Sequence, residues 1–505
     1  MQNDLMPVII GVGQVTEKDP DLDSASSPLD LMESATSQAA EDAGITRRQL
    51  EELGVLVVVK SFREPTRNSP EALADRLGAK KAMLWLTPDG GQAPQYLVNR
   101  YCAAIAEAET DFVLLTGAEA MATGRKIVKS GGKPEWQVPS STDPAYLYPD
   151  RKMWSEHERA HGIWQASHVY PLFENALRSH EGHSIEQHQK ILGQLFAPFT
   201  AIAAESPHAW YPIKRSAEEI ATATPQNRYV GWPYTKYMNA MNQINQSASV
   251  LLTSVGKAKS LGVDESRWIY LHGCADTAEL WHISDRVNYY SSLALRVLGE
   301  RVTAMAGRSM DEIDFLDLYS CFPSAVQIAR NEFGIAADDP RKLTVTGGLP
   351  FHGGAGNNYV MNSIATMIEK LRQHPGKFGM VTANGGYLGK HAAGIYSTAP
   401  TIDRWQREAP SSYQKQIDEQ LHPGMTETPQ GSGIVETYTV VYGRDNNPER
   451  GIVIGRLGDG SDPHAQRFFA NTPPDRELLE TMTRSDFIGE QGKVAQIEGI
   501  NIFSP

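Results

Sequence analysis

Cysteine is scarce in this sequence. The three cysteines among 505 residues, Cys102, Cys274 and Cys321, are too few and too far apart for a disulfide framework or a metal site of the CxxC type. We therefore predict a reducing compartment, the cytoplasm, and no bound metal.

An excess of basic charge and long apolar runs are also lacking. The formal net charge of −13 and the pI of about 5.6 argue against a nucleic-acid or anionic-membrane partner, because both need a positive field, although a local basic pocket remains open. No stretch reaches the roughly 18 uninterrupted apolar residues of a membrane span. The opening MQNDLMPVIIGVG includes Asp4 and lacks the basic region of a signal peptide. We expect neither a membrane span nor a secretory signal.

Signals for strands and helices alternate from the start of the chain. Val8 to Val12 favours a strand, and Ser27 before Pro28 is typical of a helix start, with serine as N-cap and proline in the first helical position. Gly44 suits the end of that helix. The apolar run from Gly54 to Val59 indicates a parallel strand covered on both faces. These patterns predict an α/β fold, and the length allows two to four domains.

The same order of signals returns later, which indicates an internal duplication. Ile45 to Phe62 lines up with Gly307 to Phe322, since each has a polar turn, an acidic pair and an apolar strand. Asp89 to Met121 resembles Gly353 to Gly386, because each runs from a glycine-rich turn through a helix to an apolar strand. The repeat predicts two similar α/β halves stacked face to face.

Two further segments differ from the repeated halves. The segment between them is rich in tryptophan, tyrosine, proline and histidine and contains a helical pattern at 183–196; we expect an insertion that carries substrate contacts, or a packed lid without ligand. After a polar linker, strand patterns at 435–442, 451–457, 468–469 and 494–502 and a helix at 475–484 predict a small β-barrel of the OB-like type. The expected domains are 1–124 with 231–265, 125–230, 266–415 and 431–505.

From Val8 to Ser397 the chain resembles the thiolase superfamily, and most closely its sterol-carrier-protein-type branch and the thiolase-like proteins with an added C-terminal domain. The resemblance is carried by GGQAPQYLVN with DFVLLTGAEAM, MNAMNQINQSASVLLTS, DLYSCF, GGLPFHGGAGNNY and TANGGYLGKHAAGIYST, in this order. It implies a layered α/β/α/β/α fold, an acyl-CoA substrate or ligand without a covalently bound cofactor, and a homodimer formed through the core sheets.

Thiolase chemistry needs groups that this chain lacks. It uses a cysteine thiolate at a helix N-terminus, a histidine that exchanges the proton, a second acid/base cysteine, and donors for the oxyanion. The resemblance places the nucleophile at Gly91, the histidine of the GHP motif at Gly354 and the second cysteine at Ala383. The turn at Gly90 and Gly91 can still bind a carbonyl or phosphate oxygen through free helix amides, or it is a tight turn without ligand.

Four side chains near these positions are candidates for catalysis. Cys321 is the one cysteine near the expected cleft, so it could be acylated, although a lone cysteine after an apolar strand is often a small core residue. Tyr319 stands where the family has a donor to the oxyanion. His352 precedes Gly354 by two residues and could reach the site by a shifted loop or simply bond to that loop. Asn384 could donate to the oxyanion.

Basic residues beside glycine-rich or aromatic segments are candidates for binding. Lys390 and His391 follow the turn at Gly385 and Gly386 and could bind a phosphate or carboxylate, or lie on a solvated turn. In the insertion, three basic residues among aromatic ones could contact the phosphates and adenine of coenzyme A: Lys214, Arg215 and Lys236.

Three functions follow from these residues. The first is an acyl-CoA acyltransferase that departs from thiolase chemistry, using Cys321 and His352 or direct transfer without a covalent intermediate. The second is a protein that binds coenzyme A or acyl-CoA without turnover. In the third, the C-terminal domain docks a partner enzyme.

Overall fold

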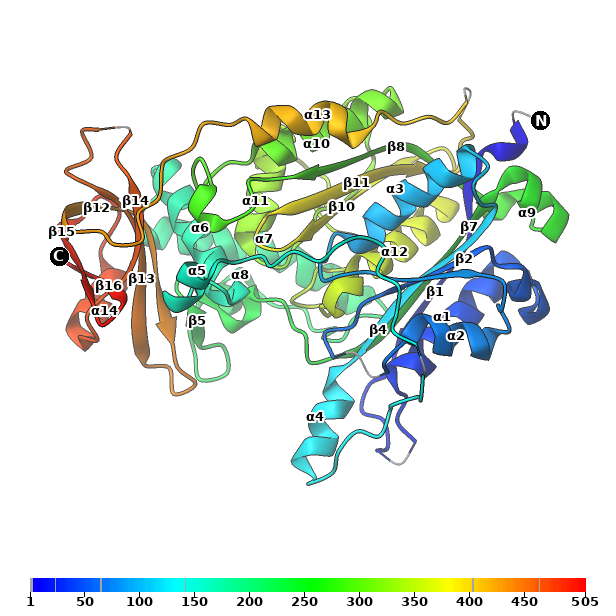
Figure 1. The fold of residues 1–505 in the computed structure, drawn as a ribbon, viewed down its shortest axis with the longest axis horizontal. Coiled ribbons are helices and arrows are strands. Elements are labelled where there is room, and N and C mark those ends of the chain that lie inside the picture. Colours follow the sequence, from blue (N-terminus) through cyan, green and yellow to red (C-terminus); the bar gives the residue numbers. More distant parts are fainter. Residues whose placement is uncertain (1–2, 23, 64–65, 141, 402–403, 463) are drawn as a thin grey trace.

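A mixed β-sheet runs through the molecule (Figure 1). The computed structural model describes residues 3–22, 24–63, 66–140, 142–401, 404–462 and 464–505. Within these residues the sheet has nine strands in the order β3-β2-β4-β7-β1-β8-β11-β10-β9. Their bounds are β1 Pro7–Thr16, β2 Val55–Val59, β3 Met83–Leu86, β4 Phe112–Ala120, β7 Asn245–Ser254, β8 Ile269–Ala278, β9 Phe315–Asp317, β10 Phe378–Gly385 and β11 Lys390–Ser397.

The strand order confirms the predicted duplication. The first half contains β2-β4-β7-β1 and the second contains β9-β10-β11-β8. In each half the first pair is parallel and the next two pairs are antiparallel. The halves meet where β1 pairs with β8 through only two residue pairs, Val8 with Tyr270 and Ile9 with Ile269.

Helices form the layers around the two halves. α3 (Ala93–Ala106) and α12 (Tyr359–Gln373) contact strands of both halves and form the central layer. α1 (Pro28–Ala43) packs on the first half and α10 (Leu293–Ala306) on the second, which gives the layered α/β/α/β/α fold expected from the sequence. Other helices of these halves are α2 Ser69–Leu77, α9 Val255–Leu261 and α11 Pro323–Glu332.

The signals that predicted α1 act as expected. The Ser27 hydroxyl accepts from the Asp30 amide at 3.2 Å, and the Asp30 carboxylate accepts from the Ser27 amide at 2.8 Å, so the two residues form a capping box. Gly44 ends the helix with φ of 71°, a conformation that glycine adopts without strain.

The segment between the halves contributes mainly helices. They are α4 Met121–Lys129, α5 Glu156–Ala160, α6 Ala166–His180, α7 Ile185–Glu205 and α8 Ala217–Ala221, followed by the short strands β5 Tyr229–Gly231 and β6 Tyr234–Thr235. α7 contains the helical pattern expected from the sequence. Figure 1 shows α5, α6 and α8 between the nine-stranded sheet and the C-terminal strands.

The C-terminal part forms a closed five-stranded barrel. Each of β12 (Gly431–Tyr442), β13 (Pro448–Leu457), β14 (Arg467–Asn471), β16 (Ile500–Ser504) and β15 (Gln491–Ile497) pairs with the next, and β15 pairs back to β12. The single strand predicted at 494–502 is instead two strands, because Glu498 and Gly499 turn the chain with positive φ angles of 49° and 83°. α14 (Arg476–Arg484) packs on the barrel, and α13 (Pro410–Asp418) precedes it.

A buried arginine joins the barrel to the second half. Arg467 on β14 is 0% exposed and donates to both carboxylate oxygens of Glu436 on β12, at 2.9 and 2.8 Å. It also donates to the carbonyl oxygens of Ser284, at 3.0 Å, and Arg286. The Arg286 guanidinium in turn donates to the carbonyl oxygens of Tyr387 and Leu388. The barrel is therefore connected by hydrogen bonds to the turn after β10.

Among the described helices, none is both long and apolar enough to cross a membrane.

Candidate functional site

A cavity of about 950 Å³ lies where the N-terminus of α3, the segments after β9 and β10, and the insertion meet. Its walls combine glycine-rich turns, aromatic rings and a few polar groups, as ligand sites commonly do. Residues lining it include Lys60, Phe62, Asp89, Gly90, Gly91, Met153, Trp164, Tyr170, Lys236, Asn239, Asn242, Tyr319, Cys321, Phe322, Asn357, Asn384, Gly385, Gly386 and Tyr387.

The surroundings of Gly91 are too crowded for the side chain that a thiolase would carry at this position. A Cβ atom at Gly91 would lie 2.6 Å from the Tyr319 hydroxyl and 2.6 Å from the Asn384 carbonyl oxygen, closer than real Cβ contacts allow. The turn itself is held firmly, because the Gly90 amide donates to Asn357 Oδ1 at 2.9 Å and Asn357 Nδ2 donates to Asp89 at 3.0 Å. The turn persists, and a tyrosine hydroxyl occupies the space beside it.

Tyr319 is held by its backbone and by a neighbouring ring. Its amide donates to Thr382 Oγ1 at 2.9 Å, and its ring packs edge-on against Tyr359 with centroids 5.9 Å apart. Burial, with Cys321 and Tyr359 nearby, raises the pKa of the Tyr319 hydroxyl well above its ordinary value. The hydroxyl therefore stays protonated at neutral pH and can donate to an oxygen of a ligand.

Cys321 lines the cavity as a protonated thiol. The residue is 7% exposed, and burial raises the pKa of its thiol to about 12, although a hydrogen bond shared with Tyr170 opposes the shift. Nucleophilic cysteines normally have a lowered pKa and a positive environment. The sulfur thus faces the expected cleft but is poorly suited to attack a thioester at neutral pH.

Tyr170 connects several of these groups and was not anticipated from the sequence. Its hydroxyl donates to the Gly386 carbonyl at 3.0 Å and accepts from Asn384 Nδ2 at 2.8 Å. Its ring stacks on Phe322 with centroids 4.4 Å apart. The residue lies on α6 of the insertion, where neither motif nor spacing marks it.

Asn384 has one polar atom directed to no protein group. Its Nδ2 donates to Tyr170, whereas Oδ1 is buried and has no hydrogen-bond partner among the described residues. Such an acceptor is costly to bury unless a ligand or water donates to it. Gly385 and Gly386 follow Asn384 and line the same cavity.

His352 does not line this cavity. The residue is 0% exposed, and its ring packs edge-on against Tyr359 at 5.9 Å. Burial, aided by the nearby His208, lowers the pKa of His352 to about 3, so the ring is neutral at physiological pH. Cys321 therefore lines the large cavity without His352, although the sequence suggested that the two residues could act together.

The basic candidates lie in different places. Lys236 is exposed and lines the cavity, whereas Lys214 is exposed elsewhere and Arg215 stacks on Tyr237 at 4.0 Å. Lys390 and His391 line a neighbouring cavity of about 550 Å³.

The neighbouring cavity touches the turn before α3. Lys390 Nζ donates to the Asp89 carbonyl at 2.6 Å and thereby supports that turn from the second cavity. His391 is 2% exposed, and burial lowers its pKa to about 4, so it is a neutral ring at pH 7.

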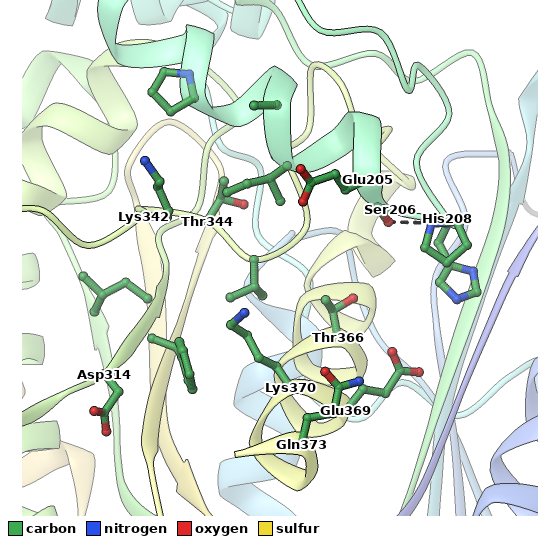
Figure 2. A pocket seen from close by; sticks show the side chains of 17 residues that line it. Glu205, Ser206, His208, Asp314, Lys342, Thr344, Thr366, Glu369, Lys370 and Gln373 are labelled. Atoms are coloured by element: carbon green, nitrogen blue, oxygen red, sulfur yellow. Dashed lines mark hydrogen bonds between the residues drawn. The ribbon is translucent and has the colours of Figure 1, made fainter.

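A third cavity, of about 690 Å³, lies between the C-terminal end of α7, the segment at 342–345 and α12 (Figure 2). Its charged side chains are of both signs, with Glu205, Asp314 and Glu369 as well as Lys342 and Lys370 around the cavity (Figure 2). The polyanionic end of coenzyme A favours a positive field, so this cavity matches that ligand poorly.

The paired halves, the central helices and the cavity at the start of α3 define a thiolase-fold protein. A solved structure described as a monomeric SCP2-thiolase like protein type 1 (STLP1) from Mycobacterium smegmatis matches with 36% identity over 100% of both chains and a TM-score of 0.85. The chain therefore belongs to the SCP2-thiolase-like protein type 1 family. The model of the thiolase-like protein type 1 additional C-terminal domain also matches residues 412–498.

More distant solved structures share the fold alone. An Ltp2-ChsH2(DUF35) aldolase has 17% identity and a TM-score of 0.60, covering 78% of this chain and 98% of its own. An acetyl-CoA acetyltransferase from Syntrophomonas wolfei has 14% identity and a TM-score of 0.53, covering 78% of this chain and 99% of its own. Among curated proteins no match is found.

Proposed function

We propose that the chain binds an acyl-CoA thioester in the 950 Å³ cavity and does not perform thiolysis. The observation that carries the proposal is the Tyr319 hydroxyl, which lies beside Gly91 where a nucleophilic side chain would need to be. Without a thiolate, the first step of a covalent route is missing. The donor Tyr319 and the acceptor Asn384 Oδ1 remain to hold a thioester or amide, and Tyr170, whose hydroxyl donates to the Gly386 carbonyl, positions Asn384.

The orientation of the ligand follows from the polarity of the walls. The thioester would lie near Gly91, which is partly exposed, and the buried Cys321, and the phosphates would lie near Lys236, which is exposed at the cavity. Phe62 and Trp164, 49% and 39% exposed, offer ring faces for an adenine. A role in lipid metabolism in the cytoplasm agrees with such a ligand and with three unpaired cysteines.

A second candidate is acyl transfer that departs from thiolase chemistry. It is favoured by the position of Cys321, whose sulfur lines the cavity and shares a hydrogen bond with Tyr170. In this reaction the Cys321 sulfur bonds to the acyl carbon while the carbon–sulfur bond to coenzyme A breaks, and the thiol proton moves to the departing sulfur. The alternative is direct transfer to an acceptor molecule.

Incubation with acetyl-CoA distinguishes these functions. At 100 times the dissociation constant we expect about 2.7 kcal/mol of ligand-induced stabilisation in thermal unfolding, with no acyl mass on the intact protein. Cys321→Ser should retain this stabilisation, as should the control Cys274→Ser, whose sulfur lies away from the cavity. Acyl mass located on Cys321 would establish the second candidate. Cleavage of acetoacetyl-CoA by the purified chain would contradict the proposal.

We also propose that the chain is monomeric, although the sequence suggested a homodimer. At the edge of the nine-stranded sheet, the Leu86 amide of β3 donates to the Ala145 carbonyl and the Leu147 amide donates to the Leu86 carbonyl, both at 2.9 Å. The insertion thus occupies backbone groups through which a second copy could extend the sheet. Light scattering after gel filtration should give about the 55.6 kDa of one chain. A mass near twice that value at micromolar concentration would contradict the proposed monomer and support the homodimer.

A further inference from the structure

Three side chains at the turn between α6 and α7 converge on one point. Glu181, His183 and His188 each direct a potential ligand atom there, and these atoms lie within 4.8 Å of one another. They belong to the sequence HEGHSIEQH at 180–188, which has no cysteine. Because the segment lacks the CxxC pattern, its sequence did not indicate a metal site.

The spacing of these atoms matches a tetrahedral metal site. His183 Nδ1 lies 3.4 Å from His188 Nδ1 and 3.3 Å from Glu181 Oε2. Ligands at about 2.0–2.1 Å from a tetrahedral zinc ion are roughly 3.3–3.4 Å apart. The ligand atoms of the remaining pair, Glu181 and His188, lie within 4.8 Å of each other, so the partly exposed Glu181 side chain has to approach the ion when it binds.

A buried carboxylate orients one of the histidines. His188 Nε2 lies 2.6 Å from Glu174 Oε1, so the Nε2 proton is directed to Glu174 and the lone pair of Nδ1 faces the cluster. Histidine ligands of metals are characteristically held in this way. On the other side, Asn331 Nδ2 donates to Glu181 Oε1 at 3.3 Å, which leaves Oε2 free to face His183.

The charge of Glu174 supports a cation at this place. Glu174 is 0% exposed, and its other contacts are with the neutral Gln327 amide at 2.8 Å and the Tyr234 hydroxyl at 2.6 Å. Among the described residues neither lysine nor arginine forms an ion pair with it. A buried carboxylate needs a positive partner, which is either a protonated His188, whose Nε2 lies 2.6 Å from Glu174, or an ion bound at Nδ1 of the same ring.

The cluster is reachable from solvent and its backbone is fixed. The side chains of His183 and Glu181 are 30% and 23% exposed, so an ion can enter and water can complete its coordination. Arg178 donates to the His183 carbonyl at 3.0 Å and pairs with Asp486 of the C-terminal part at 2.6 Å. The turn is therefore held against the barrel.

We propose that Glu181, His183 and His188 bind one divalent ion of the zinc class, with water as the fourth ligand. The ion fixes α6 against α7 beside the barrel. It does not depend on the proposed acyl-CoA site, although Tyr170 lies one helical turn before Glu174.

The full-length protein, stripped with a chelator, should take up one equivalent of zinc with submicromolar affinity in a competition titration with a zinc indicator. Cobalt, a probe of geometry, should give the intense visible absorption of a tetrahedral site. His183→Ala and Glu181→Gln should each weaken zinc binding by at least 10-fold, because each removes a ligand but leaves the buried residues in place. Zinc should also raise the Tm of the parent chain but not of His183→Ala.

The control is His180→Ala, which removes a neighbouring histidine that stacks on Tyr290 at 3.8 Å and contributes no ligand to the cluster. It should bind zinc as tightly as the parent. The alternative is a hydrogen bond between His183 and His188 without an ion. Failure to take up zinc stoichiometrically, or equal affinity in His183→Ala and the parent, would overturn the proposal in favour of that hydrogen bond.

Discussion

Replacing Arg467 with methionine is expected to lower the free energy of unfolding by about 3–5 kcal/mol, because it leaves buried carbonyl groups of the second half without their donor and Glu436 with Arg456 as its remaining partner. Arg467 binds both oxygens of Glu436 and reaches three backbone carbonyls of the second half, and its side chain is fully buried. Denaturant unfolding, followed by circular dichroism and tryptophan fluorescence, measures the loss.

Arg456→Met is the matched control. Arg456 also pairs with Glu436, at 3.0 Å, but its side chain is 20% exposed and it does not reach the second half. We expect a loss of about 1 kcal/mol, in the range of a partly exposed pair. The double variant Arg467→Met with Glu436→Met should recover only part of the stability, because Arg456 then loses its carboxylate partner and the carbonyl groups of Ser284 and Arg286 stay without a donor. A loss in Arg467→Met no larger than that in Arg456→Met would contradict the role of Arg467.

The ion pair between Arg467 and Glu436 also makes the free energy of unfolding depend on pH. Burial alone would raise the pKa of Glu436, but Arg467 and Arg456 outweigh burial and hold it below the ordinary value. A carboxyl with a lowered folded-state pKa contributes stability above its unfolded pKa of about 4.3, and loses it as pH falls through the folded pKa. The stability difference between the parent and the double variant should therefore shrink in acid.

Gly91→Cys is expected to lower the free energy of unfolding by about 1–3 kcal/mol without creating thiolase activity, since the new side chain overpacks the site. Its Cβ would contact the Tyr319 hydroxyl and the Asn384 carbonyl, and the latter belongs to a strand that cannot easily move. Thermal unfolding and intact mass after incubation with acetyl-CoA measure the two effects.

Gly424→Cys provides the control, because a Cβ there meets nothing within 4 Å. This variant should have nearly the same free energy of unfolding as the parent and should remain unacylated. Adding Tyr319→Phe to Gly91→Cys should restore part of the stability by removing the nearest hydroxyl. If Gly91→Cys were as stable as the parent and became acylated, then the site would lack only a sulfur atom, and the proposed function would need revision.

Much of the fold could be predicted because its signals are local. The cap at Ser27, the stop at Gly44 and the apolar run at 55–59 each act within a few residues, and their repetition identified the second half. The turn at 498–499 was missed because Glu498 is a poor signal for a positive φ. Only the pairing of β15 with β16 shows that two strands are present.

The site was less predictable because its contacts join distant segments. Gly91 and Asn384 belong to motifs in the two repeated halves, so the sequence could identify them. The duplicated fold brings both motifs to the same cavity. Tyr170 comes from an inserted helix, and its partners lie more than 200 residues away, so neither spacing nor motif could reveal it. The place of His352 was open for the same reason: sequence proximity to Gly354 does not fix the direction of the ring, which lies outside the lining of the large cavity.

The short strand β5 pairs with β12 of the barrel at Gly231 and Val441, and Trp232 stacks on Tyr438 inside the barrel core. The chain then continues directly to Lys236, Asn239 and Asn242, which line the large cavity. One wall of the large cavity is consequently continuous with a strand that pairs with the C-terminal domain. Truncating the polypeptide before residue 431 would remove the packing partner of Trp232 and so disturb that wall.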